Sequence, residues 1–331
     1  LIRHVKGVFI MKRKTIFVTS LFTVILLLLT GCGMKRESVS EGKCKVVTTI
    51  FPPYDFVREI AGDKVELTML LKPGSESHTY EPSPQDILKI QQCDIFIYNG
   101  GESDEWVRQI LDSIDMEGKT VMAMMDMVDP VEEETVEGMQ EDEEEHTEDT
   151  EHEGKHEYDE HVWTDPANAI TISEKISEAL IEKDTMNKET YQKRAESYIK
   201  QLHELDQGFR SVIKAGKRKT IVVGDRFPFR YFVEAYNLKY YAAFPGCVAE
   251  SEPSASTVTF LIQKVKENKI PVVFTIEMSN GKMAHTIAEG TGAKVLTFHS
   301  CHNVTADDFE AGAGYLSLMK ANLINVKEAL Q

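Results

Sequence analysis

The segment NKETYQKRAESYIKQLHELDQGFRSVIKAG, residues 187–216, predicts one long helix over residues 187–214. A helix of about 28 residues extends roughly 42 Å, because each residue adds 1.5 Å along the axis. That length exceeds the width of a single small lobe. We therefore expect this helix to be a strut that joins two lobes of the chain.

Short apolar runs alternate with helical segments on both sides of this helix. Four runs before it have the character of strands: CKVV (44–47), KVELTMLL (64–71), CDIFIYNG (93–100) and KTVMAMMDM (119–127). Four more follow it: KTIVVGD (219–225), LKYYAAF (238–244), PVVFTIE (271–277) and AKVLTFH (293–299). Strands that alternate with helices predict parallel sheets covered by helices on both faces. The sequence therefore predicts the α/β class, with one lobe over 44–186 and a second over 215–331.

The N-terminus has the features of a lipoprotein signal. Basic MKRK at 11–14 precedes the apolar run IFVTSLFTVILLLL, and the run ends in LTGC at 29–32. This pattern predicts a signal peptide over 11–32, lipid attachment at Cys32 and a polar tether over 33–43. The alternative is an uncleaved membrane helix. The lipoprotein interpretation implies a lipid-anchored protein on the extracytoplasmic face of the cell membrane, where disulfides are allowed.

The formal net charge of -17 argues against nucleic acid as a partner. Most of this charge is local, because residues 132–160 contain 16 acidic residues and a single lysine. The segment has few apolar residues, so it predicts a disordered loop over about 132–160. Its histidines His146, His152 and His156 would collect metal ions weakly, and the alternative is a merely solvated charged loop.

Three further histidines follow predicted strands or precede a predicted helix. His78 lies after the second strand, His161 stands before the helix that starts at TDPANA, and His299 ends the last strand. Ligands of parallel sheets usually bind beyond the carboxyl ends of the strands. Neutral imidazoles are common zinc ligands. The sequence therefore predicts a metal site in the cleft between the lobes, with His78, His161 and His299 as ligands.

The motifs PGSESHTYEPSPQD and DEHVWTDPANA, together with the lipobox, resemble the solute-binding lipoproteins of zinc and manganese ABC transporters. The resemblance covers the chain from about residue 44 to its end. It implies two α/β lobes bridged by one rigid helix, a single divalent ion held between them, and a monomer that delivers the ion to an ABC permease in the membrane. By this resemblance, His78 and His161 match two of the family's ligands.

The sequence departs from the family pattern at the two other ligand positions. The third position, usually His or Glu, falls on Arg226, whose guanidinium cannot bind a cation. The fourth position, usually Asp, falls on His299. The fourth ligand therefore stays open among water and the side chains of Asp225, Glu252, Glu277 and Cys301, and Arg226 would pair with one of those acids.

Three imidazoles favour Zn²⁺ as the bound solute over manganese, which prefers oxygen ligands. Nickel, cobalt and copper would accept the same set. A disulfide between Cys247 and Cys301 is expected, with a free Cys301 that binds metal as the alternative, and Cys44 and Cys93 could also pair. We interpret His302 and His285 as surface residues, although His302 is close enough to the site to test, and His203 as structural.

The sequence predicts a binding protein and not an enzyme. The main alternative is a secreted zinc hydrolase. Against it, the chain has no GxSxG nucleophile elbow, and its HEGKH stretch at 152–156 falls in the predicted disordered loop and not on a predicted helix. A surface adhesin is a third interpretation, since the lipid anchor would permit it. Stoichiometric metal binding without turnover would separate the binding protein from both alternatives.

Overall fold

The computed structural model describes residues 42–76, 79–140, 158–246 and 253–331. The chain divides into two units, Leu1–Gly42 and Lys43–Gln331, and the description below concerns the second. The predicted signal peptide and its Cys32 lie outside the described residues. Within the described ranges, none of the helices has the length and apolar character needed to cross a membrane.

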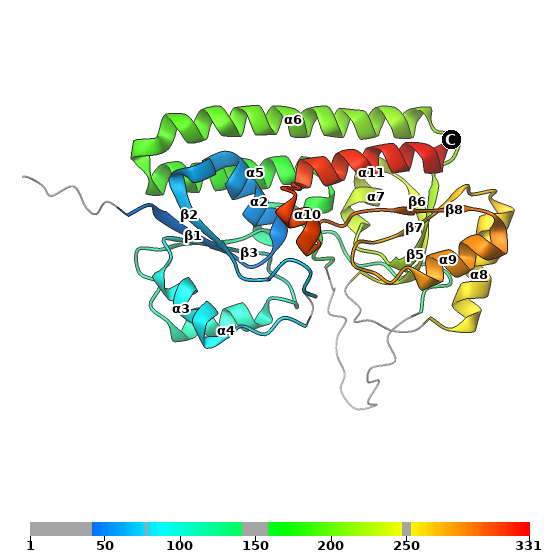
Figure 1. Cartoon of the computed structure of the whole chain (residues 1–331), viewed down its shortest axis with the longest axis horizontal. Helices are drawn as coiled ribbons and strands as arrows, with labels where there is room; N and C mark the ends of the chain where they lie inside the picture. Colours follow the sequence, from blue (N-terminus) through cyan, green and yellow to red (C-terminus); the bar gives the residue numbers. More distant parts are fainter. Residues whose placement is uncertain (1–41, 77–78, 141–157, 247–252) are drawn as a thin grey trace, which may run out of the picture. The chain divides into compact units, whose positions relative to one another are not determined.

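The N-terminal lobe is built on a parallel sheet with the strand order β2-β1-β3-β4. Its strands are β1 (Cys44–Thr48), β2 (Val65–Met69), β3 (Ile95–Tyr98) and β4 (Thr120–Ala123). Neighbouring strand residues face opposite sides, so Val46 packs in the core beneath α2 (Phe51–Ala61) and Val47 packs toward the opposite face. That opposite face is covered by α3 (Pro84–Gln92) and α4 (Glu105–Ser113), as Figure 1 shows.

The C-terminal lobe repeats this design with the strand order β6-β5-β7-β8, again parallel. Its strands are β5 (Thr220–Arg226), β6 (Lys239–Phe244), β7 (Val272–Thr275) and β8 (Lys294–Thr297). The connecting helices are α7 (Arg230–Tyr236), α8 (Ala255–Glu267) and α9 (Lys282–Thr291). The two parallel sheets confirm the predicted α/β class.

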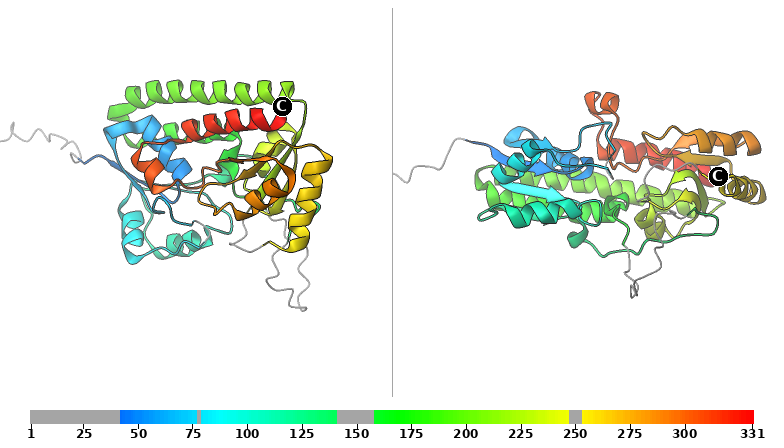
Figure 2. Two further views of the ribbon diagram at one scale, coloured as in Figure 1. Left: turned by 45° about the vertical axis from the view of Figure 1, so that its right-hand side comes forward. Right: turned by 90° about the horizontal axis from the view of Figure 1, so that it is seen from below.

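The predicted strut is α6 (Lys188–Ala215), which is 28 residues long. Its buried residues recur every three or four positions and form one stripe: Tyr191, Ala195, Tyr198, Leu202, Leu205, Phe209 and Ile213. Helix α6 packs against α5 (Pro166–Lys183), α11 (Tyr315–Leu330) and α2, and it also reaches α7 of the C-terminal lobe. Figures 1 and 2 show α6 running past both sheets.

One hydrophobic core extends through both lobes. It contains Val46 and Phe51 of the N-terminal lobe, the buried stripe of α6, and Ile221 and Phe298 of the C-terminal lobe. Hydrogen bonds between the lobes accompany this core: the Trp163 indole donates to the Ser300 carbonyl at 2.7 Å. The lobes are therefore joined by side-chain packing as well as by the long helix.

The acidic segment differs from the prediction over its first nine residues. Residues 132–140 lie along the C-terminal lobe instead of forming a disordered loop. The Gln140 amide donates to the Ala243 carbonyl at 2.9 Å, and Lys264 pairs with Glu137 at 3.3 Å. Val136 and Met139 of this segment also pack against the hydrophobic core, so apolar contacts and polar bonds together order it. The loop histidines His146, His152 and His156 lie outside the described residues.

Candidate metal centre

His161 is fully buried at the start of the short helical turn η3 (Val162–Thr164). The Asp159 carboxylate accepts a hydrogen bond from the His161 amide at 2.8 Å and lies 3.2 Å from its ring Nδ1. A ring that donates from Nδ1 carries its lone pair on Nε2, which is the arrangement of a metal-binding histidine held by a carboxylate. The predicted ligand therefore has the orientation that metal binding requires.

The electrostatic surroundings of His161 favour a cation. Burial alone lowers the pKa of this imidazole, but the carboxylate of Asp159 opposes burial and, with Glu160 and Glu133, raises the pKa above its usual value. The same negative charges attract a metal ion, which competes with the proton for the ring.

His302 is the histidine that the structure brings beside His161. Their ring centroids lie 5.1 Å apart, and Trp163 packs against both rings at 5.5 Å from His161 and 5.0 Å from His302. His302 is only 7% exposed. The interpretation of His302 as a surface residue is therefore wrong. Both histidines line one small cavity, together with Glu76, Arg226, Pro228, Gly246, Ile276, Glu277, Met278 and Ser300.

His299 lies three residues before His302 and is held on α11 through its backbone. Its amide donates to the Asn322 side chain and its carbonyl accepts from the same side chain, both at 2.8 Å. His299 is not among the residues that line the cavity around His161. The described residues contain no group of three histidines, cysteines or carboxylates spaced to hold a metal ion, and His78 and Glu252 lie outside them.

Two carboxylates that were candidate fourth ligands have structural partners. Both oxygens of Glu277 accept hydrogen bonds from Ser300, at 2.7 Å from its amide and 2.6 Å from its hydroxyl. The Ser300 hydroxyl in turn accepts from the His302 amide at 3.2 Å. Glu277 therefore holds the loop that carries His302. Asp225 accepts from the Thr275 hydroxyl at 3.1 Å and lines a neighbouring cavity instead.

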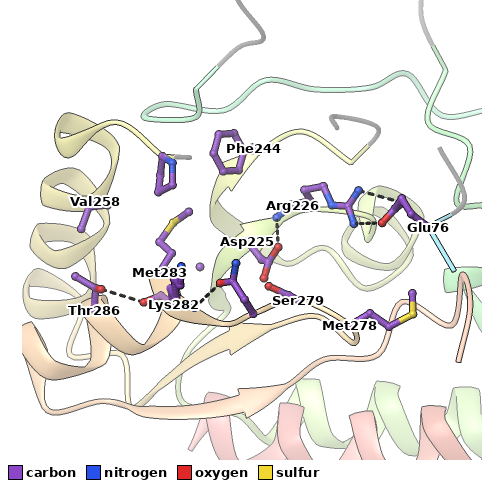
Figure 3. A pocket seen from close by; sticks show the side chains of 13 residues that line it. Glu76, Asp225, Arg226, Phe244, Val258, Met278, Ser279, Lys282, Met283 and Thr286 are labelled. Atoms are coloured by element: carbon purple, nitrogen blue, oxygen red, sulfur yellow. Dashed lines mark hydrogen bonds and ion pairs between the residues drawn. The ribbon is translucent and has the colours of Figure 1, made fainter. Parts of the chain in front are cut away.

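Arg226 forms a two-bond ion pair with Glu76, at 3.2 and 3.4 Å, as Figure 3 shows. The sequence pointed to Asp225, Glu252 or Glu277 as its partner. Glu76 comes instead from the loop that precedes His78, and Glu252 lies outside the described residues. Such pairing across distant segments has no local sequence signal. The Arg226 side chain is 15% exposed, and both members of the pair line the cavity of His161.

Cys301 carries a free and fully buried thiol. Burial raises its pKa well above the ordinary value, which disfavours the thiolate that binds metal. Cys301 does not form the expected disulfide in this structure, and Cys247 lies outside the described residues. Cys44 and Cys93 are also free. They pack in different apolar clusters, so their side chains face opposite sides of the N-terminal sheet.

Comparison with known proteins assigns the chain to a family of zinc-uptake proteins. The family model described as zinc-uptake complex component A, periplasmic (ZnuA) matches residues 46–329. The chain belongs to this family. The ZnuA match includes both lobes, the long helix and the two histidines of the cavity.

Two curated relatives in this family carry zinc in their names. The chain is 33% identical over 319 residues to the zinc-binding lipoprotein AdcA of Streptococcus pneumoniae, with 96% of this chain and 61% of AdcA covered. It is 32% identical over 316 residues to the high-affinity zinc uptake system protein ZnuA of Bacillus subtilis, with 92% and 94% covered. The chain thus spans about three fifths of the length of AdcA.

The fold also agrees with a solved ZnuA-type structure. The Zn(II)-bound ZnuA-like domain of Streptococcus pneumoniae AdcA superposes with a TM-score of 0.71 at 30% identity. The superposition covers 87% of this chain and 99% of that domain. The two lobes and the bridging helix are therefore the architecture of this family.

Proposed function

We propose that this protein captures one Zn²⁺ ion outside the cytoplasm, while anchored to the membrane through lipid on Cys32, and delivers the ion to an ABC permease as a monomer. The observation that carries this proposal is the buried pair of His161 and His302, with Asp159 orienting the first ring. The names of the relatives AdcA and ZnuA and the Zn(II)-bound AdcA domain support zinc as the solute.

The proposed ligands are His78, His161 and one histidine of the loop after β8. The sequence prediction for that loop is His299, whereas the short distance between the His161 and His302 rings supports His302. Glu76 lines the same cavity and supplies a carboxylate close to the ion. Two or three imidazoles with one carboxylate form a set that zinc accepts in tetrahedral geometry. Manganese would require more oxygen ligands.

The proposed chemistry is binding and release without a catalysed reaction. Glu277 is engaged by Ser300 through both oxygens, so it is poorly placed to activate a water molecule as a hydrolase would require. The acidic segment serves as an auxiliary collector of ions in this proposal. Residues 132–140, which contact the C-terminal lobe, directly precede in sequence the segment that contains His146, His152 and His156.

The first test measures metal content and zinc affinity of the full chain by elemental analysis and competition titration. We expect one tightly bound zinc ion per chain. His161→Ala and His302→Ala should each weaken zinc binding at least 100-fold, because each removes a ligand. His285→Ala is the matched control, since His285 is exposed on α9, and should leave the affinity unchanged.

Two further variants separate the alternatives within the proposal. If His302 is the ligand, His299→Ala should change the zinc affinity less than threefold. A 100-fold loss of zinc affinity would identify His299 as the ligand instead. Deletion of residues 141–157 should preserve the tight site and remove only weak binding. A protein that keeps full zinc affinity after loss of both His161 and His302 would contradict the proposed site.

A further inference from the structure

A second cavity of about 440 Å³ lies in the C-terminal lobe, beyond the carboxyl ends of its strands (Figure 3). Strands β5 and β7 are neighbours, but the chain leaves β5 toward β6 and leaves β7 toward β8 on the other side. Such a reversal opens a crevice between the two strand ends, where ligands of open α/β sheets bind. The cavity is lined by residues after both strands, including Asp225 and Ser279.

This cavity is distinct from the one that holds His161 and His302. The two share only Glu76, Arg226 and Met278 among their lining residues, so the Arg226–Glu76 ion pair forms part of the wall between them. The volume of the second cavity lies within the range of small-molecule sites, about 300–1,000 Å³, whereas a bare metal ion needs far less space. The size indicates an organic ligand.

Among the lining residues that the structure describes, the charged groups balance each other. Arg226 and Glu76 neutralise one another, which leaves the Asp225 carboxylate and the Lys282 ammonium as the remaining pair of opposite charges. Lys282 is exposed at the start of α9 and forms no ion pair with any residue that the structure describes. The Asp225 carboxylate is held in place by the Thr275 hydroxyl and the Arg226 amide. A ligand that matches this cavity carries one positive and one negative charge.

The rest of the described lining combines the polar side chains of Ser279, Asn280 and Thr286 with a group of apolar ones. Phe244 ends β6, Val258 lies on α8 and Met283 lies on α9, and Figure 3 shows their side chains around the same space. Methionine adapts its shape to different apolar groups. The ligand therefore combines a compact zwitterion with an uncharged apolar body.

We propose that this cavity binds a free α-amino acid with an apolar side chain. The ammonium group pairs with Asp225, the carboxylate pairs with Lys282 at the positive end of α9, and the side chain packs against Phe244, Val258 and Met283. This site goes beyond the capture of zinc. Among the proposed zinc ligands that the structure describes, Glu76 lines the cavity, whereas His161 and His302 do not.

Isothermal titration of the full chain with L-leucine and three analogues tests both charges of the ligand. The analogue 4-methylpentanoate lacks the ammonium group, 3-methylbutylamine lacks the carboxylate, and glycine lacks the apolar body. We expect L-leucine to bind and each analogue to bind at least tenfold more weakly, because the first two analogues each lose one charged contact and glycine loses the apolar contacts. Equal binding of leucine and either single-charge analogue would overturn the zwitterion assignment.

Variants locate the binding in this cavity. Lys282→Glu should weaken leucine binding at least tenfold, and Met283→Trp should block it by filling the space, while both keep the zinc affinity of the unaltered chain. Lys320→Glu, an exposed lysine on α11, is the control for a charge reversal elsewhere. The proposal fails if valine, leucine, isoleucine, methionine and phenylalanine all show no binding at 10 mM, or if Lys282→Glu and Met283→Trp leave leucine binding unchanged.

Discussion

Arg226→Gln removes a positive charge from the wall of the cavity that His161 and His302 line, which is the proposed zinc site. The substitution keeps a polar side chain. In this family a metal ligand normally stands at the position of Arg226, according to the sequence resemblance. In the proposed site, the guanidinium repels an ion held by His161 and His302, and its ion pair with Glu76 offsets part of the attraction between that carboxylate and the ion. We expect the substitution to increase zinc affinity for both reasons.

The size of this increase in zinc affinity follows from Coulomb's law and from the solvent exposure of the Arg226 and Glu76 side chains. The Arg226 side chain is 15% exposed and that of Glu76 is 34% exposed, so solvent and the opposite charge of Glu76 together weaken the repulsion between the guanidinium and the ion. For a divalent ion about 7 Å from the guanidinium and an effective dielectric constant between about 40 and 80, the repulsion is about 1–2.5 kcal/mol. The dissociation constant should therefore fall about 5- to 50-fold.

Glu76→Gln should have the opposite sign, because it removes the attracting carboxylate and leaves Arg226 without this partner. The double variant should lie close to the unaltered protein, since both charges are then absent. Competition titration against a chromogenic chelator at 0.05 and 0.5 M salt measures all four proteins, and the difference due to Arg226→Gln should shrink at high salt. Arg210→Gln, which breaks an exposed ion pair on α6, is the control. A loss of affinity in Arg226→Gln, or a change equal to that of the control, would refute this reasoning.

Three other substitutions test how the packing around the site contributes to folding stability. Trp163→Phe removes the buried hydrogen bond to Ser300, so chemical denaturation should show a loss of about 1–3 kcal/mol. Gly224→Ala places a methyl group 2.7 Å from the Ala284 backbone and should lower the melting temperature by several degrees. Burial raises the pKa of Asp55 to about 6, so the folded state binds this proton more tightly and stability falls as pH rises from about 4 to about 6. Asp55→Asn should reduce that fall by about 2 kcal/mol in denaturation curves recorded across this pH range.

Much of the fold could be predicted from local pattern. The stripe on α6 repeats at helical spacing over its whole length, and the buried strands are continuous apolar runs. Helix α4 was missed although it is amphipathic. Its first residue follows Asp104, whose carboxylate accepts from the Asn99 and Gly100 amides instead of capping the helix. Asp104 precedes the helix, as an N-cap residue would, but its carboxylate stabilises the preceding turn and makes no capping hydrogen bond to the helix.

The site could be predicted only in part, because its geometry depends on contacts between distant residues. His161 stood out through its motif. His302 was missed because its direction depends on a left-handed backbone at Cys301, with φ of 60°, and on the hold of Glu277 on Ser300. The order of residues 132–140 likewise depends on Lys264, which is more than 120 positions away. Neither effect has a local sequence signature.

The hydrophobic core that the two lobes share also limits the motions by which zinc reaches the proposed site. Trp163 and Tyr315 are fully buried, and the Tyr315 hydroxyl donates to the Trp163 carbonyl at 2.7 Å. Exposing two such aromatic side chains by opening the lobes would cost about 3–6 kcal/mol before any hydrogen bond is lost, a large part of the stability of a typical domain.

Motion of the loops at the strand ends is much less costly. The hydrogen bonds that hold residues 72–76 on the C-terminal lobe include the Gly74 amide to the Val304 carbonyl at 2.7 Å and the Asn303 side chain to the Lys72 and Ser75 carbonyls, both at 2.8 Å. The Arg226–Glu76 pair holds the same loop and is partly exposed. For the proposed zinc site, we expect entry and release of the ion to involve detachment of this loop from Arg226 while the lobes stay packed on α6, so Arg226→Gln should change the release rate as well as the affinity.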